Sequence, residues 1–174
     1  IYDAVVCEPN SSSCMAAADF VKQGKYDGIV SIGGGSVMDT AKAANLLSCH
    51  GGEILDYVNA PIGLAKKVPG PLLPHIACPT TSGTGAETTG IVVLDIEEVG
   101  LKSGISSPHL KPNHAIVDPE TTLTLPSGVI ASTGFDVLTH AVESYVARPY
   151  TSSDRPLDPS LRMGYQGATP YNDI

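Results

Sequence analysis

Apolar and polar residues recur with two different periods along the first part of the chain. Residues 2–7 are apolar and β-branched, which predicts a short strand. Residues 14–24 carry apolar side chains at helical spacing and end at Gly24, a residue that suits a helix C-cap. A short apolar run at 27–32 predicts a buried strand, and 37–48 has a strongly helical pattern. This alternation predicts a parallel sheet with helices packed on its faces.

Beyond residue 50, Gly and Pro interrupt the pattern more often. Residues 51–74 hold many Gly and Pro and predict a long loop with a short helical piece. Further strands are predicted at residues 75–79, 91–95 and 115–117, with 96–102 as a turn. The overall expectation is an α/β fold.

A helix is expected from Pro126-Ser127 to Val146, with Gly134 marking a break between two helices. The tail from Arg148 onward contains several prolines and no apolar period. No internal repeat is present in the sequence.

Composition excludes several classes of function. The net charge of -8 over 174 residues argues against a nucleic-acid partner, because phosphate binding needs clustered Lys and Arg. No stretch approaches the roughly 20 apolar residues of a membrane span. The cysteines lack the paired spacing of zinc sites, and we expect reduced, mostly buried thiols in an intracellular protein. Their positions are Cys7, Cys14, Cys49 and Cys78.

The glycine-rich loop Gly33-Gly34-Gly35-Ser36 lies between a predicted strand and a predicted helix. A helix N-terminus presents unpaired N–H groups and a partial positive charge, and glycines let a phosphate approach the backbone. Ser36 could cap the helix or donate to a phosphate oxygen. The loop is neither the Gly-x-Gly-x-x-Gly fingerprint nor a P-loop. A tight strand-to-helix turn without a ligand is the alternative.

A second loop, residues 79–87, concentrates threonine, serine and glycine after another predicted strand. Such a segment exposes amides and hydroxyls at the carboxyl ends of strands, where open α/β sheets bind ligands. A polar loop with Ser/Thr caps is the alternative. Two such loops together favour a dinucleotide site.

Asp136 and His140 are four residues apart in a predicted helix and therefore share one face. A carboxylate and an imidazole suit Fe²⁺, Zn²⁺ or a similar metal, although a catalytic metal needs at least three protein ligands. A surface Asp–His pair, or Asp136 as a helix cap, is the alternative that spacing alone favours.

Three segments together resemble the iron-containing (group III) alcohol dehydrogenases, in family order and with similar spacing. They are Gly33-Gly-Gly-Ser-Val-Met-Asp-Thr-Ala-Lys-Ala43, Pro79-Thr-Thr-Ser-Gly-Thr-Gly-Ala-Glu87 and Ser132-Thr-Gly-Phe-Asp-Val-Leu-Thr-His-Ala-Val-Glu-Ser-Tyr145. The resemblance covers almost all of residues 1–147. It implies an N-terminal Rossmann-like domain and a C-terminal helical domain with the active site between them.

By this resemblance, residues 1–125 form part of the Rossmann-like NAD-binding domain and residues 126–174 begin the helical metal-binding domain. Both ends read as internal to a longer chain, because no initiator Met is present and Asn172-Asp173 resembles a helix start. The family's acid for the adenosine ribose would lie upstream, and two further histidine ligands downstream. A homo-oligomer is compatible with the resemblance.

The resemblance also implies roles for individual residues. Gly34, Gly35 and Ser36 would contact the NAD pyrophosphate, and Asp39 matches the family's acid on the cofactor side. The residues implied at the pyrophosphate and nicotinamide end are Thr80, Thr81, Thr84 and Lys102. Asp136 and His140 would be the first two ligands of a divalent metal, Fe²⁺ or Zn²⁺.

The tail resembles one branch of the family, the mitochondrial hydroxyacid–oxoacid transhydrogenases of animals, through Arg148-Pro-Tyr150 and the segment 164–174. This branch implies small hydroxy-acid and oxo-acid substrates and a mitochondrial matrix location. It moves a hydride from 4-hydroxybutyrate to 2-oxoglutarate through bound NAD. The alternatives are a conventional NAD-dependent alcohol dehydrogenase and a non-catalytic nucleotide-binding remnant.

Overall fold

The computed structural model describes residues 1–152, 154–155, 157 and 167–169. The segment 164–174, which carries part of the resemblance to the transhydrogenase branch, lies mostly outside these residues. Among the described residues, none of the helices combines the length and apolar character that crossing a bilayer requires.

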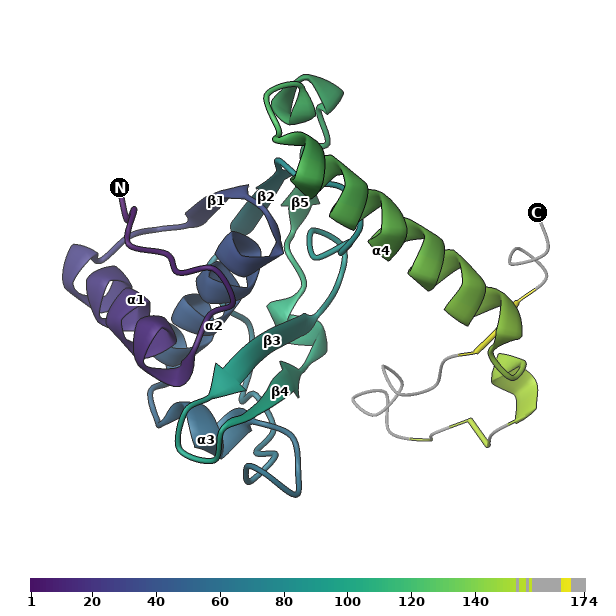
Figure 1. Cartoon of the computed structure of the whole chain (residues 1–174). Coiled ribbons are helices and arrows are strands. Elements are labelled where there is room, and N and C mark those ends of the chain that lie inside the picture. Colours follow the sequence, from purple (N-terminus) through teal and green to yellow (C-terminus); the bar gives the residue numbers. More distant parts are fainter. Residues whose placement is uncertain (153, 156, 158–166, 170–174) are drawn as a thin grey trace.

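Two helices and a small sheet form the N-terminal half of the molecule (Figure 1). Helix α1 (Ser11–Gly24) begins three residues before the predicted helix, because Asn10 and Ser13 form a capping box. Strand β1 (Ile29–Gly33) leads directly into helix α2 (Gly35–His50), as predicted. The two helices pack closely through small buried side chains. These include Cys14, Ala17, Ala18, Ala43 and Ala44.

The sheet of strands β1, β2 (His75–Pro79) and β5 (His114–Ala115) has the order β1-β2-β5 and is entirely parallel. The predicted parallel sheet is therefore confirmed. Parallel strands end at the same edge, so the loops that follow β1 and β2 lie next to each other. This edge carries the site described below.

A hairpin of β3 (Ile91–Ile96) and β4 (Leu101–Ser106) packs against the helices. The two strands are antiparallel, and β4 was not predicted. Strand β4 includes Lys102 and Gly104 and shows little alternation of apolar and polar side chains. It is a strand because it pairs with β3. Val92, Leu94, Ile96 and Ile105 are buried in the main core.

Short helices complete the chain. The predicted helical piece in the long loop is α3 (Ile54–Tyr57). Single 3₁₀ turns occur at Pro108–Leu110, Pro119–Thr122 and Tyr150–Ser152.

Three predictions about local structure are wrong. Residues 2–7 form no strand, because no neighbouring strand pairs with them in the described structure. Helix α4 (Ser127–Val146) is continuous through Gly134, whose surroundings are open, so nothing forces a break there. All four cysteines are free thiols, as expected, but Cys7 and Cys49 are exposed rather than buried.

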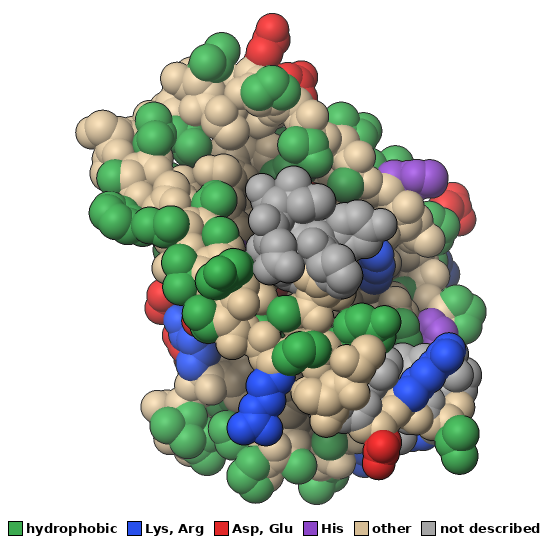
Figure 2. All heavy atoms as spheres, turned by 90° about the vertical axis from the view of Figure 1, so that its right-hand side faces the viewer, with side chains coloured by type: hydrophobic (Ala, Val, Ile, Leu, Met, Phe, Trp, Pro, Cys, Tyr) green, Lys and Arg blue, Asp and Glu red, His purple; other side chains and the backbone are tan. Residues whose placement is uncertain are grey.

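Helix α4 projects away from the sheet and buries none of its residues (Figure 1). Figure 2 looks onto this side of the molecule and shows hydrophobic side chains spread over it. Phe135 is 71% exposed, Leu138 56% and Val142 52%. An apolar helix with so much exposed surface normally packs against further protein.

Candidate functional site

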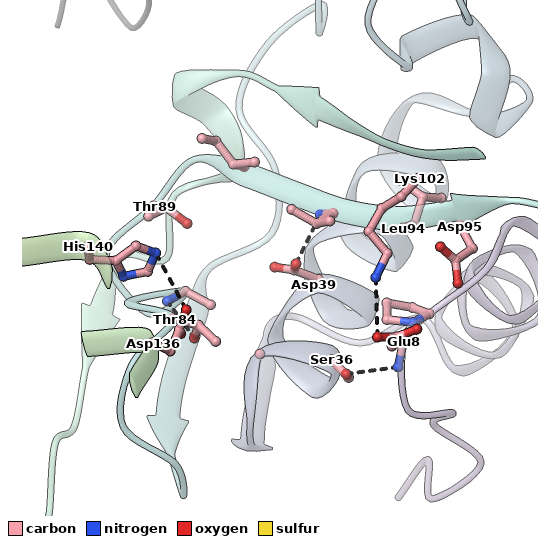
Figure 3. Close-up of a pocket in the computed structure, with 15 residues that line it drawn as sticks. Glu8, Ser36, Asp39, Thr84, Thr89, Leu94, Asp95, Lys102, Asp136 and His140 are labelled. Atoms are coloured by element: carbon pink, nitrogen blue, oxygen red, sulfur yellow. Dashed lines mark hydrogen bonds and ion pairs between the residues drawn. The ribbon is translucent and has the colours of Figure 1, made fainter. Parts of the chain in front are cut away.

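A cavity of about 670 Å³ lies between α2, the β3–β4 hairpin, the loop after β2 and α4. Figure 3 shows its two ends, with Ser36, Glu8 and Lys102 at one end, Asp136, His140 and Thr84 at the other, and Asp39 between them. The lining residues are Glu8, Pro9, Gly35, Ser36, Asp39, Thr84, Ala86, Thr89, Ile91, Val93, Leu94, Asp95, Lys102, Asp136 and His140.

The N-terminus of α2 opens into this cavity. Its N-cap is Gly34, and no side chain caps the helix. Gly35 and Ser36, the first two helical residues, line the cavity. A helix start that no side chain caps offers N–H groups and a partial positive charge to an anion.

The loop after β2 packs directly on the glycine-rich loop. The backbone N–H of Thr80 donates to the carbonyl of Gly33 over 2.9 Å. A Cβ at Gly34 would lie 3.1 Å from Thr81 Oγ1, and one at Gly35 would lie 3.1 Å from Thr84 Cγ2. Any side chain larger than hydrogen would therefore crowd the two loops.

Glu8 links the glycine-rich loop to the hairpin. Its backbone N–H donates to Ser36 Oγ over 3.1 Å, and its carboxylate lies 3.2 Å from Lys102 Nζ. Ser36 therefore does not cap α2, which was one of the roles considered for it. Glu8 was not predicted, because no local pattern connects residues so far apart in sequence.

Asp39 lies on the inner face of α2 in the middle of the cavity. Its Oδ2 accepts a hydrogen bond from the backbone N–H of Val93 over 2.9 Å, and its Oδ1 lies 3.3 Å from Lys42 Nζ. Burial raises the pKa of Asp39, while the charge of Lys42 and the Val93 N–H act in the opposite direction. Burial likewise lowers the pKa of Lys42, and Asp39 opposes that change.

Asp136 and His140 share the face of α4 that meets the loop after β2. Asp136 Oδ1 lies 3.8 Å from His140 Nε2. His140 Nδ1 lies 3.0 Å from the carbonyl oxygen of Gly83, which can only accept, so Nδ1 carries the hydrogen. Asp136 is in the middle of α4, which rules out the helix-cap alternative.

The Asp136–His140 pair fits part of a divalent metal site. With Nδ1 donating to Gly83, the nitrogen that remains for a metal is Nε2, which lies 3.8 Å from Asp136 Oδ1. A carboxylate oxygen and an imidazole nitrogen are donors that suit Fe²⁺ and Zn²⁺. Among the described residues, however, no group of three or more His, Cys, Asp or Glu side chains could hold an ion.

The structure brings most of the predicted site residues to one cavity. Those that line it are Gly35, Ser36, Asp39, Thr84, Lys102, Asp136 and His140. Gly34, Thr80 and Thr81 are not in its lining and lie where the two loops pack on each other. Lys42 and Gly83 were missed, although Lys42 follows Asp39 by the three residues that place two side chains on one helical face.

The family profile described as iron-containing alcohol dehydrogenase matches residues 1–119. The mitochondrial hydroxyacid-oxoacid transhydrogenase of Rattus norvegicus is 53% identical over 176 residues, covering 100% of this chain and 38% of that protein. The chain therefore spans less than half the length of this curated relative.

Solved structures resemble the chain at lower sequence identity. Sulfoacetaldehyde reductase from Bifidobacterium kashiwanohense, in complex with NAD⁺, has a TM-score of 0.77 and 36% identity over 87% of this chain and 40% of that one. An iron-containing alcohol dehydrogenase from Thermotoga maritima has a TM-score of 0.74 and 34% identity over 85% of this chain and 39% of that one.

Proposed function

The chain belongs to the iron-containing alcohol dehydrogenase family, and we propose that it is part of an oxidoreductase that transfers a hydride through bound NAD. We further propose a hydroxyacid–oxoacid transhydrogenase, which oxidises 4-hydroxybutyrate and reduces 2-oxoglutarate. The identity of 53% to the rat transhydrogenase supports this choice of substrates. The mitochondrial name of that relative supports a mitochondrial location for this protein.

The observation that carries the proposal is the cavity itself, which has a helix start without a side-chain cap at one end and the Asp136–His140 pair at the other. Hydride transfer needs the cofactor and the substrate oxygen to meet in one enclosed space. The family and the NAD⁺-bound relative support NAD and a divalent metal as the cofactors.

We assign the pyrophosphate of NAD to the N-terminus of α2, where Gly34, Gly35 and Ser36 supply backbone N–H groups and one hydroxyl. Asp39 accepts a hydrogen bond from a hydroxyl or amide group of the cofactor. The residues assigned to the rest of the cofactor are Thr80, Thr81, Thr84 and Lys102. The tight packing of the two loops keeps these groups in place before the cofactor binds.

We assign Asp136 and His140 as two of the metal ligands, with the others outside residues 1–174. When bound, a divalent metal supplies Lewis-acid stabilisation of negative charge on the substrate oxygen. The Gly83 carbonyl holds the imidazole of His140 in the tautomer and orientation that a ligand needs. Both donors suit Fe²⁺ and Zn²⁺, so elemental analysis of the purified protein identifies the metal.

The proposed domain organisation, with residues 1–125 in the nucleotide-binding domain and 126–174 in a helical domain, has support in exposed apolar surface. Val30 and Ile32 on the edge strand β1 are 60% and 65% exposed. Helix α4 also buries none of its residues. Edge strands and apolar helices of this kind are normally covered by further strands or helices.

The full-length protein, supplied with 4-hydroxybutyrate and 2-oxoglutarate but no added NAD, tests the proposal. Formation of 2-hydroxyglutarate is expected, because in a transhydrogenase the reduced cofactor stays bound between the two half-reactions. Product formation only after NAD is added, together with NADH release from a simple alcohol, would assign the protein to the conventional dehydrogenases instead.

A further inference from the structure

Lys42 is a fully buried lysine one turn after Asp39 in α2, with an exposed fraction of 0%. Its ammonium group donates to three acceptors: Asp39 Oδ1 at 3.3 Å, Thr89 Oγ1 at 3.2 Å and the carbonyl oxygen of Ile91 at 2.8 Å. An ammonium group has three donors, so each has a partner. The group is thus completely bound inside the protein.

The carboxylate of Asp39 connects this buried ammonium to the cavity. One oxygen receives Lys42 and the other receives the backbone N–H of Val93 over 2.9 Å. A carboxylate has about four lone-pair positions. Asp39 lines the cavity, and Figure 3 shows its carboxylate between the two ends, so a ligand there can reach the remaining positions.

Burying a charged pair between a helix and a strand carries a large desolvation free energy. Removing two charges from water costs several kcal/mol per ion in order of magnitude, and apolar side chains of similar size often give equal or greater stability. The ammonium does, however, what no apolar side chain can do. It keeps a negative charge on a carboxylate that burial would otherwise tend to protonate.

We propose that Lys42 is a positioning residue for the cofactor: it holds the Asp39 carboxylate in its charged form and directs its free lone pairs into the cavity. There Asp39 accepts a hydrogen bond from a hydroxyl or amide donor of NAD. This inference rests on the proposed assignment of the cavity to NAD.

Other titratable and charged groups face the Asp39–Lys42 pair. Cys14 on α1 interacts with Asp39, and Glu87 and His75 interact with Lys42 from the loop after β2 and from β2 itself. The remaining groups line the same cavity: Glu8, Asp95, Lys102, Asp136 and His140. All of these residues are unchanged in the variants below. Lys42→Met also removes a charge that lowers the pKa of His75, but burial is the main cause of that shift, and the NADH titrations are compared above the pH range in which His75 takes up a proton.

The test is a double-mutant cycle on the full-length protein after removal of its cofactor, with NADH affinity measured by fluorescence titration. Lys42→Met and Asp39→Asn should each weaken NADH binding about tenfold. In the Asp39→Asn background, Lys42→Met should cause no further loss, because its effect passes through Asp39. If the two losses of NADH affinity multiply in the double variant, or if Lys42→Met binds NADH like the wild type, the inference is overturned.

A pH series adds a measurement that a purely structural role would not change. Without the ammonium, Asp39 should take up a proton at a higher pH than in the wild type. NADH affinity of Lys42→Met should therefore rise from about pH 6 to about pH 9 more steeply than that of the wild type. Parallel profiles would contradict the inference. Lys42→Gln, which keeps donors but loses the charge, gives the same test if Lys42→Met does not fold.

Asn45 provides a matched control on the same helix. It is 2% exposed, and its side chain exchanges hydrogen bonds of 2.8 and 3.0 Å with the backbone of Leu73, away from the cavity. Asn45→Leu should lower the unfolding temperature as Lys42→Met does, but leave NADH affinity within about twofold of the wild type. Equal loss of NADH affinity in both variants would make the role of Lys42 structural. Wild-type protein that fails to bind NADH would instead overturn the proposed function, and the inference with it.

Discussion

The carbonyl oxygen of Gly83 accepts a hydrogen bond of 3.0 Å from Nδ1 of His140. Gly83 belongs to the loop after β2 that is assigned to the cofactor, and His140 belongs to the helix that is assigned to the metal. This contact therefore joins the two halves of the proposed active site. It also sets which nitrogen of His140 is available as a ligand.

Gly83→Ala should weaken metal binding in the full-length protein by about ten- to a hundredfold. Gly83 has a φ of +105°, and a Cβ there would lie 2.7 Å from Asp136 Oδ2 and 3.0 Å from the carbonyl oxygen of Thr133. The loop or α4 must move, and the hydrogen bond to His140 is then lost. The measurement is metal content per subunit after equilibration with a competing chelator.

Gly85→Ala is the matched control for this prediction. Gly85 also has a positive φ, +61°, but the nearest atom to its added Cβ would be Thr88 Oγ1 at 3.8 Å. Gly85→Ala therefore also places an alanine at a positive φ, but its Cβ makes no contact with Asp136. Equal metal loss in both variants would show that loop strain alone, and not the contact with α4, determines metal affinity.

Asp136→Ala should reduce bound metal to less than about a tenth of the wild-type content and remove activity with it, because a catalytic metal with three or four protein ligands rarely tolerates the loss of one. Elemental analysis and the hydride-transfer assay measure the two effects. Ser144→Ala is the control, since the hydroxyl of Ser144 donates to the carbonyl of Ala141 in the same helix and, among the described residues, to no other acceptor. Unchanged metal and activity in Asp136→Ala would contradict the ligand assignment.

The elements that the sequence predicted well are those whose pattern is local. The apolar period of α2 and the apolar runs of β1 and β2 identified all three elements and the parallel sheet. Strand β4 was missed because it is a strand only through β3. Its Gly104 admits the backbone of Val92, whose carbonyl oxygen would lie 2.6 Å from a Cβ at residue 104. The periodicity of apolar residues gives no indication that the two backbones approach so closely at Gly104.

In the candidate site, too, the residues in local motifs were predicted and the contacts between distant segments were not. Ser36, Asp39, Asp136 and His140 lie in motifs that resemble a family, and the structure places all of them on one cavity. Gly83 contributes a carbonyl oxygen, which every residue has, so no residue type could signal it. Contacts between distant segments are likewise invisible in a single sequence, including the two that Glu8 makes.

Cys14 should resist alkylation in the native protein at about pH 8. Burial raises the pKa of its thiol to about 12, with the nearby Asp39 carboxylate acting in the same direction, and the thiolate is the reactive form. Mass spectrometry after brief treatment with iodoacetamide measures the labelling at each cysteine. Labelling of Cys14 should appear only when urea is added. Rapid native labelling would mean that α1 opens readily or packs differently.

His75 should make the protein less stable as the pH falls from about 6.5 to about 4. Its side chain is buried, and Nε2 lies 2.8 Å from Ser31 Oγ on the neighbouring strand. Burial is the main cause that lowers the pKa of His75 from 6.5 to about 4, so in this range the unfolded chain binds a proton that the folded chain does not. Because of that difference, the free energy of unfolding rises with pH, by about 3 kcal/mol between about pH 4 and about pH 6.5.

His75→Gln isolates this contribution, because glutamine can still bond to Ser31 but does not titrate. Urea unfolding at several pH values measures the free energy of unfolding of both proteins. The advantage of the wild type over His75→Gln should shrink by about 3 kcal/mol between about pH 7 and about pH 4. If both proteins lose stability in parallel, the acid sensitivity comes from other groups, and His75 is protonated in the folded state at a more ordinary pH.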